Sequence, residues 1–449
     1  MNSFFDLTLP DIMKSSLKTA ISDAVSIYRE YNEGNPCFSR NRVFTMEKVI
    51  ELLLSMSGGS LNKELYAAGI KASPSAFSQQ RDKIPLTAFE DVLEYFNLQC
   101  RDKQTFKGYR VFAVDGTTVN MARNPKSDSF MCGRSKGKNQ NEIKGYNQLH
   151  ATPLYDVLNK TYKYCVIQPQ PRQDEIGALT HLLNMCGDCF EEKTLIVADR
   201  GFESYNTFAY FQEEEHGNID FLIRCKNDVS GMREIKKLPM QKLDVDVDFT
   251  LTTTQTNADK ANGYIYINTH KNENKTYKSR ACRWIYGSSY HMKFRVVRIL
   301  LDTGEYETLA TSLPRSITAG EIKELYHSRW GIETAFRELK YSVGLVNLHG
   351  KKDKFVEQEI FAAIIMNNFA SRIVNEIVLK QEQHNALEYK VNQKMAIYLC
   401  REFFRKDHAD GEQLMKDISR FTEAVRPGRN DTRHIKAQFF RGFIYRVSA

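Results

Sequence analysis

The spacing of apolar residues along the chain predicts helices first, then strands, then helices again. Up to about residue 105, apolar residues recur every three or four positions, the period of a helix with one buried face. Residues 60–84 hold two short helical segments, and Ser73 with Pro74 suits the start of the second. With Arg81 on its outer side, this pair fits either a helix-turn-helix, whose second helix reads a nucleic-acid groove, or a plain helical hairpin.

From Tyr109 onward the pattern changes to that of buried strands. Val111–Val114 and Thr194–Ala198 are short apolar runs, and each is followed at once by an aspartate, Asp115 or Asp199. Further elements are expected as strands at 148–158, 161–168 and 219–225 and as helices at 174–183 and 205–215. Three strands, a helix, a strand, a helix and a strand, with an acid after the first and fourth strands, is the order of a ribonuclease H-like fold.

A β-rich insertion is expected between residues 228 and 315, because Leu243–Leu251 alternates strictly between apolar and polar residues. After Ser316 the chain returns to helical spacing. The predicted fold class is therefore α/β: a ribonuclease H-like catalytic core interrupted by a β-rich insertion and flanked by helical N- and C-terminal regions. The expected boundaries are 1–105 for the helical N-terminal region, 106–227 for the first part of the core, 228–315 for the insertion, 316–350 for the second part of the core and 351–449 for the helical C-terminal region.

The composition is that of a globular protein with a mild positive charge. Of 449 residues, 42% are hydrophobic and 26% charged, which is too apolar for a disordered chain. No uncharged apolar run approaches the roughly 18 residues of a membrane span, and the N-terminus lacks the plan of a signal peptide. We therefore expect a cytoplasmic protein without a membrane partner. Between Arg426 and Arg446, six Lys or Arg residues stand among aromatics, which fits a nucleic-acid-contacting tail or a solvated C-terminus equally well.

Cysteine and histidine spacing gives no sign of a metal site. The nine cysteines are scattered, and their odd number favours a reducing compartment over a disulfide framework. Cys186 and Cys189 form a lone CxxC with no second pair at zinc-ligand spacing, so we expect both in the core. His150 and His327 also lie at no ligand spacing, and we expect both to be incidental.

The helix expected over Ala319–Tyr341 has a polar face beside its apolar stripe. At about 100° per residue, Glu333 stands at the centre of that face. Its neighbours within roughly 40° are Tyr326, Arg329, Arg337 and Lys340. Many such faces are solvated surfaces with ion pairs between residues four apart.

Asp115, Asp199 and Glu333 are the candidate catalytic and metal-ligating residues. An acid directly after a buried strand lies at the carboxyl edge of the sheet, where sites in α/β proteins gather. If Glu333 faces that edge, three hard oxygen ligands suited to Mg²⁺ or Mn²⁺ converge. Two such ions can activate an attacking hydroxyl and stabilise the leaving oxygen in phosphodiester displacement, while the neighbouring cations hold phosphates.

A known family shows the same residues. The spacing Tyr326, two residues, Arg329, three residues, Glu333, six residues, Lys340 matches the YREK signature. With Asp115-Gly116-Thr117 and Asp199-Arg200-Gly201-Phe202, the chain resembles a DDE transposase of the insertion-sequence-four family of bacterial mobile elements, over residues 40–445. That family also places a β-rich insertion between its second aspartate and its glutamate.

The resemblance implies a cut-and-paste reaction at the ends of an insertion sequence, in some members through a hairpin on the element end. Asp115 would ligate both of two Mg²⁺ ions, for which Mn²⁺ can substitute, and Asp199 and Glu333 would hold one side each. Phosphates of the element end would be contacted by Tyr326, Arg329, Lys340 and Arg337.

The implied partners are double-stranded DNA, as terminal inverted repeats and target, and a second copy of the chain in a homodimeric synaptic complex. The implied location is the nucleoid of a bacterial cytoplasm. Family placement favours the helix-turn-helix interpretation, with Arg81 on the DNA. Trp284 or Tyr306 in the insertion would stack a displaced base or simply pack in the core.

Other functions remain open at this point. A regulator derived from a transposase would bind DNA without cutting it, although the presence of all three acids argues against that. A structure-specific nuclease of the same fold would cut without joining. A two-carboxylate glycosidase fits less well, because Arg329, Arg337 and Lys340 surround the acid.

Overall fold

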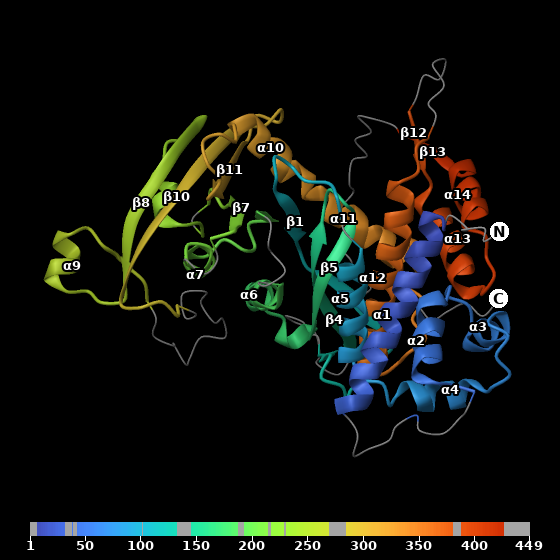
Figure 1. The fold of residues 1–449 in the computed structure, drawn as a ribbon. Coiled ribbons are helices and arrows are strands. Elements are labelled where there is room, and N and C mark those ends of the chain that lie inside the picture. Colours follow the sequence, from blue (N-terminus) through green and yellow to red (C-terminus); the bar gives the residue numbers. More distant parts are fainter. Residues whose placement is uncertain are drawn as a thin grey trace.

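The computed structural model describes residues 7–31, 38, 43–100, 102–132, 145–186, 193–213, 217–228, 230–268, 284–379 and 388–425. Within them the chain is a mixed α/β protein with a central mixed sheet and helical flanks (Figure 1). This agrees with the predicted class and is consistent with a ribonuclease H-like core. The basic segment 426–446 and Cys189 lie outside the described residues, whereas Cys186 is buried as expected.

The N-terminal region is helical, as its apolar spacing predicts. Its helices are α1 (Leu9–Tyr31), α2 (Met46–Ser55), α3 (Leu61–Ala67), α4 (Pro74–Arg81) and α5 (Thr87–Gln99). Side-chain caps start three of them: the hydroxyls of Thr45, Ser60 and Ser73 accept from the N–H groups three residues on. The predicted pair of short helices in residues 60–84 is therefore confirmed as α3 and α4.

One continuous sheet joins the core and the insertion. Its strands in the first part of the core are β1 (Arg110–Val114), β2 (Thr117–Met121), β3 (Phe130–Met131), β4 (Tyr146–Asp156), β5 (Thr161–Pro169), β6 (Thr194–Ala198) and β7 (Ile219–Cys225). The helical segments between them are a 3-10 turn (Gln170–Arg172), α6 (Glu175–Cys186) and α7 (Tyr205–Tyr210). Strands β1, β6 and β7 run parallel, and β4 pairs antiparallel with β1.

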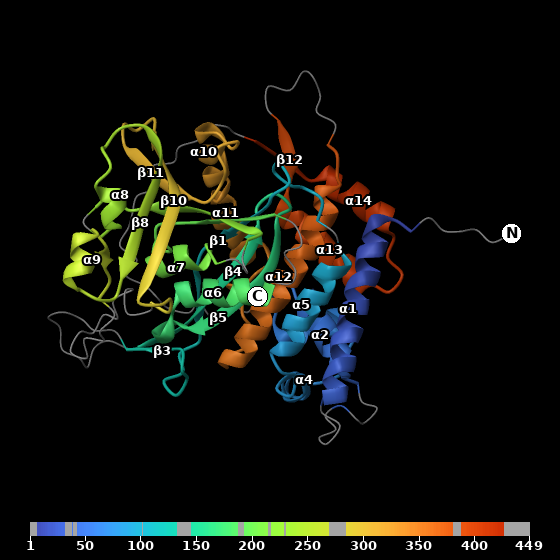
Figure 2. The same ribbon diagram turned by 60° about the vertical axis from the view of Figure 1, so that its left-hand side comes forward.

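The insertion extends this sheet instead of forming a separate one (Figures 1 and 2). It contains α8 (Arg233–Lys236), β8 (Leu243–Thr252), α9 (Asn257–Ala261), β9 (Ile265–Tyr266), β10 (Ser289–Leu300) and β11 (Tyr306–Thr311). Strand β11 pairs antiparallel with β7, and β10 and β8 follow outward. The alternation over 243–251 places one face of β8 toward apolar neighbours and leaves the Asp244, Asp246 and Asp248 face polar.

The helix expected as one piece over 319–341 is divided. It forms α10 (Ala319–Ser328), α11 (Trp330–Arg337) and a π-helical turn (Glu338–Ser342). At the first break the Ile332 N–H donates to the Arg329 carbonyl, only three residues back. The remaining elements are α12 (Asp353–Asn375), β12 (Tyr389–Val391), α13 (Gln393–Arg405), α14 (Gly411–Arg420) and β13 (Thr422–Ala424).

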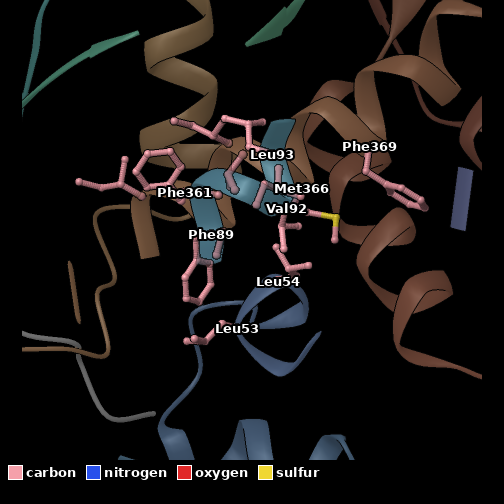
Figure 3. Packing of buried hydrophobic residues seen from close by; sticks show 14 of the residues in the cluster. Leu53, Leu54, Phe89, Val92, Leu93, Phe361, Met366 and Phe369 are labelled. Carbon is pink, nitrogen blue, oxygen red and sulfur yellow. The ribbon is translucent and has the colours of Figure 1, made fainter. Parts of the chain in front are cut away.

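Helix α12 is the centre of the largest hydrophobic core. Most of its side chains are buried, and they pack against α1, α2, α5, α13 and one face of β4 and β5. In Figure 3, Val92 of α5 lies next to Met366 of this helix, with Phe361 to one side and Phe369 to the other. This packing fixes the C-terminal helices against the sheet and so positions α11 beside β1. Among the described residues no helix is long and apolar enough to cross a membrane.

Candidate active site

Two aspartates meet at one edge of the sheet. Strands β1 and β6 are parallel neighbours in a register that pairs Val114 with Ala198, so the next residues, Asp115 and Asp199, leave the sheet side by side. Each carboxylate accepts a backbone hydrogen bond that fixes it over the following turn: Asp115 Oδ1 from Gly116 N at 2.8 Å and Asp199 Oδ1 from Gly201 N at 2.6 Å. The predicted convergence of these two acids is confirmed.

The pKa of Asp115 reflects this crowding. Burial raises it to about 6, and the negative charges of Asp199 and Glu175 add to the rise. The Gly116 N–H and the Arg329 guanidinium act in the opposite direction. Any cation that enters the site would stabilise the charged form of Asp115 and reduce the repulsion between these acids.

Arg329 connects Glu333 to the aspartate edge, because its guanidinium contacts both Asp115 and Glu333. Nη1 of Arg329 lies 3.6 Å from Asp115 Oδ2, and Nη2 lies 3.3 Å from Glu333 Oε1. The Arg329 side chain is only 6% exposed, whereas the two carboxylates are 26% and 29% exposed. Helix α11 thus presents Glu333 toward the end of β1, where a buried guanidinium links it to Asp115.

The other signature residues differ in exposure. Tyr326 is 1% exposed and its ring lies 5.7 Å from the Arg329 guanidinium, while the exposed Trp330 covers that guanidinium at 5.1 Å. Lys340 is half-buried, which lowers its pKa, and Arg337 is exposed. Two members of the predicted polar face are thus covered: Tyr326 joins the apolar cluster that packs on β1, β6 and β7, and Arg329 is buried beside Asp115.

The donor set fits a divalent cation in its chemistry. Asp115 and Asp199 offer hard carboxylate oxygens with mutual repulsion that a cation would relieve. Within the part of the chain that the structure describes, no three His, Cys, Asp or Glu side chains are close enough together to hold an ion. Glu333 is engaged with Arg329, so it must change partner before it can serve as a third ligand.

Comparison with known proteins decides the family. A family model described as a transposase DDE domain matches residues 106–369, more than half of the chain. The chain belongs to the transposase DDE domain family. Membership implies a phosphoryl-transfer enzyme of DNA transposition, and DDE transposases generally use divalent metal ions.

Two further comparisons add less. A search of curated proteins found no match. Among solved structures, the chain is similar to a piggyBac transposase in a synaptic complex with hairpin DNA, with a TM-score of 0.44 and 11% identity over 94% of this chain and 84% of that one.

Arg81 is not on the surface of this DDE protein. It is 2% exposed, and its guanidinium bonds Gln358 Oε1 at 2.8 Å, Glu359 Oε1 at 2.9 Å and the Phe355 carbonyl. The predicted outward orientation of Arg81 is therefore wrong. The face of α4 that carries Arg81 packs against α12, because its guanidinium finds a carboxylate and two further acceptors there.

Trp284 lies in the insertion beside a cavity. The cavity has a volume of about 400 Å³, and its wall also includes Tyr205, Lys226 and Arg233. Trp284 packs edge-on against Tyr286 and Tyr290, and its Nε1 donates to the Gly287 carbonyl at 3.0 Å. The indole of Trp284 therefore packs in this aromatic group and borders the cavity. Tyr306 is the first residue of β11, where it pairs with Leu300 of β10.

Sequence reasoning missed two residues at the edge of this DDE site. Glu175 begins α6, and its Oε1 lies 3.2 Å from Nε2 of His150 on β4. His150 is 3% exposed, and its place beside Glu175 could not be read from spacing along the sequence. The available signal was an acid at the start of the helix that follows three strands, which places it near the ends of β1 and β6 once the order of strands is known.

Proposed function

We propose that this chain is a transposase of the insertion-sequence-four type, which binds the terminal inverted repeats of its element and catalyses DNA cleavage and strand transfer. The observation that carries the proposal is the edge formed by Asp115 and Asp199 on adjacent parallel strands, faced by Glu333 through Arg329. The order of these acids and the YREK spacing support the assignment to this type.

In the proposed site Asp115, Asp199 and Glu333 hold a pair of Mg²⁺ ions, for which Mn²⁺ can substitute. Bound there, the ions supply Lewis acidity and lower the pKa of a coordinated hydroxyl. Arg329 compensates the charge of the acids and orients Glu333, and Tyr326 supports Arg329 from its buried position. Lys340 and Arg337, which are less buried, are proposed to hold DNA phosphates.

The reaction is two displacements at phosphorus. A water attacks the phosphodiester at the element boundary, its P–O bond to the 3′ oxygen breaks, and that oxygen leaves as a hydroxyl after taking up a proton. The freed 3′-hydroxyl then attacks a target phosphodiester and loses its proton. A homodimer that brings two element ends together completes the proposed assembly.

Trp284 is proposed to stack a base displaced from the element end. The half-buried indole at a cavity of about 400 Å³, with Lys226 and Arg233 in the same wall, offers a ring face near positive charge. Arg81 is not included among the DNA contacts, because its side chain is buried against α12.

The experiment mixes purified protein and Mg²⁺ with a duplex that carries the inverted repeat flanking this gene, and follows nicking and joining to a plasmid. Asp199→Ala serves as the inactive control. Nicking at the boundary with joined product, both absent in Asp199→Ala, is the expected result. Cleavage without joining would indicate a nuclease, and binding without cleavage under either Mg²⁺ or Mn²⁺ would leave a DNA-binding regulator.

A further inference from the structure

The edge that holds Asp115 and Asp199 contains a third carboxylate that the signature does not include. A side-chain Cβ at Gly116, the residue after Asp115, would lie 2.5 Å from Glu175 Oε1. A Cβ at Gly201, in the turn after Asp199, would lie 2.7 Å from Asp199 Oδ1 and 3.7 Å from Glu175 Oε2. One oxygen of Glu175 therefore faces the turn of each aspartate, and glycine at both turns provides the space.

The buried His150 of β4 lies beside this carboxylate. Thr118 and His150 are opposite each other in the β2–β4 pairing, and the His150 ring faces the Gly116 backbone. Its Nε2 lies 3.2 Å from Glu175 Oε1, and the Gln173 side-chain amide donates to that same oxygen at 3.0 Å. The His150 side chain is 4% exposed against 30% for Glu175, so the pair is buried at the histidine and open at the carboxylate.

We infer that Glu175 is a fourth acidic residue of the divalent-cation site and that His150 is the positioning residue that orients it. The inference rests on the proposed function, because it assumes that Asp115 and Asp199 bind the cation. Glu175 lies beside the turns that follow both aspartates. Among the described residues no three acids are already close enough together to hold an ion, so Glu175, like Glu333, would complete its approach when the ion binds. A fourth carboxylate adds a hard oxygen and a negative charge, and both increase affinity for Mg²⁺ or Mn²⁺. In this inference the neighbouring His150 ring limits the directions that the Glu175 carboxylate can take, as partners of metal-binding carboxylates commonly do.

The test measures Mn²⁺ binding to the full chain without DNA, by the electron paramagnetic resonance signal of free Mn²⁺. We expect Glu175→Gln to weaken binding by about 10- to 100-fold, Glu175→Asp to weaken it less, and His150→Gln to weaken it about tenfold. Glu324→Gln, an exposed acid on α10, is the matched control and should bind as the wild type does. Circular dichroism and thermal unfolding confirm that each variant folds.

The outcomes separate this inference from the function on which it rests. If Asp199→Ala abolishes binding while folded Glu175→Gln and Glu175→Asp both keep wild-type affinity, Glu175 is a structural partner of His150 and only this inference is wrong. If the wild type binds no Mn²⁺, or if Asp199→Ala binds it normally, the proposed metal site is wrong and the role of Glu175 with it. Graded loss over the Glu175 variants, with Glu324→Gln unchanged, supports the inference.

Discussion

Arg329 and Asp115 meet between helix α11 and the edge of the sheet, where Nη1 of the guanidinium lies 3.6 Å from Oδ2 of the carboxylate. The same guanidinium holds Glu333 at 3.3 Å. A cation of the protein itself thus neutralises part of the charge of two proposed metal ligands. A bound divalent ion and Arg329 would act on the same carboxylates, so their stabilising effects should overlap.

The overlap leads to a prediction for Arg329→Ala. Without divalent ions, the variant should lose about 1–3 kcal/mol in the free energy of unfolding, because two half-buried carboxylates lose their partner. With Mg²⁺ present, the loss should be smaller, since the ion replaces the missing charge. Urea unfolding with and without Mg²⁺ measures both values. Arg337→Ala, an exposed arginine on the same helix, should change either by about 0.5 kcal/mol at most, and an equal loss for Arg329→Ala under both conditions would contradict the overlap.

The raised pKa of Asp115 predicts a pH-dependent effect of Asp115→Asn. Because the pKa is about 6 in the folded protein against 3.8 for the free group, the folded state binds the proton more tightly. Stability therefore falls as the pH rises from about 4 to about 6. Without divalent ions, Asp115→Asn should be more stable than the wild type by about 1–3 kcal/mol at pH 8, and this advantage should disappear near pH 4.

Unfolding midpoints measured across this pH range check the prediction. Asp302→Asn, an exposed acid in the turn between β10 and β11, should show no pH-dependent difference from the wild type. If Asp115→Asn is less stable than the wild type at both ends of the range, loss of the Arg329 contact outweighs relief of the buried charge.

The sequence predicted the strands better than the surroundings of the site. Short apolar runs that end at Asp115 and Asp199 mark the strands and the acids together, because a buried parallel strand is apolar throughout and its polar residue comes where the sheet ends. Strand β2 was missed because it is short and its Thr and Asn residues break the apolar pattern.

The period of apolar residues could not predict contacts between segments that are distant in the sequence. A helical wheel gives directions around one helix, but it does not say which neighbour covers each direction. The wheel placed Tyr326 and Arg329 on the polar face, but it could not show that the apolar cluster on the sheet covers Tyr326 or that Arg329 is buried beside Asp115. Likewise, Arg81 is a charged residue at a helix end. Its buried ion pair with Glu359 can be seen only once α12 is packed against α4.

The main effect of Arg81→Ala should therefore be on the free energy of unfolding and not on DNA binding. The change leaves Glu359, whose pKa is lowered to about 2 in the folded protein by Arg81 and His349 despite its burial, without its main partner. Removal of one member of a buried ion pair costs about 3–5 kcal/mol, to be measured by thermal or urea unfolding. Arg420→Ala, an exposed arginine in α14, is the control. A variant of Arg81 that keeps wild-type stability but loses affinity for the element end would restore the original DNA-contact hypothesis.

Trp284→Ala tests the proposed stacking role. If a displaced base stacks on the indole, the loss of about 1–3 kcal/mol of stacking should reduce cleavage at the element end by roughly 5- to 150-fold. Trp284→Phe should recover most of the rate, because a ring face remains. Tyr286→Ala removes a neighbour of Trp284 that is absent from the cavity wall, and serves as the control for loss of packing. Equal rate losses in Trp284→Ala and Tyr286→Ala would indicate a packing role alone.

Gly116→Ala tests how closely the carboxylate edge is packed. The new methyl group would lie 2.3 Å from His150 Nε2 and 2.5 Å from Glu175 Oε1, so both side chains or the Asp115 turn must move. We expect a loss of about 1–3 kcal/mol in stability together with a loss of cleavage activity larger than the fraction unfolded explains. Gly331→Ala on α11 is the matched control, because its methyl group would come no nearer than 3.9 Å to a neighbour and alanine favours the helix by up to about 1 kcal/mol. Unfolding and cleavage are measured on the same preparations. Wild-type activity in Gly116→Ala would mean either that the turn can shift without moving Asp115 or that the exact position of this carboxylate does not limit the reaction.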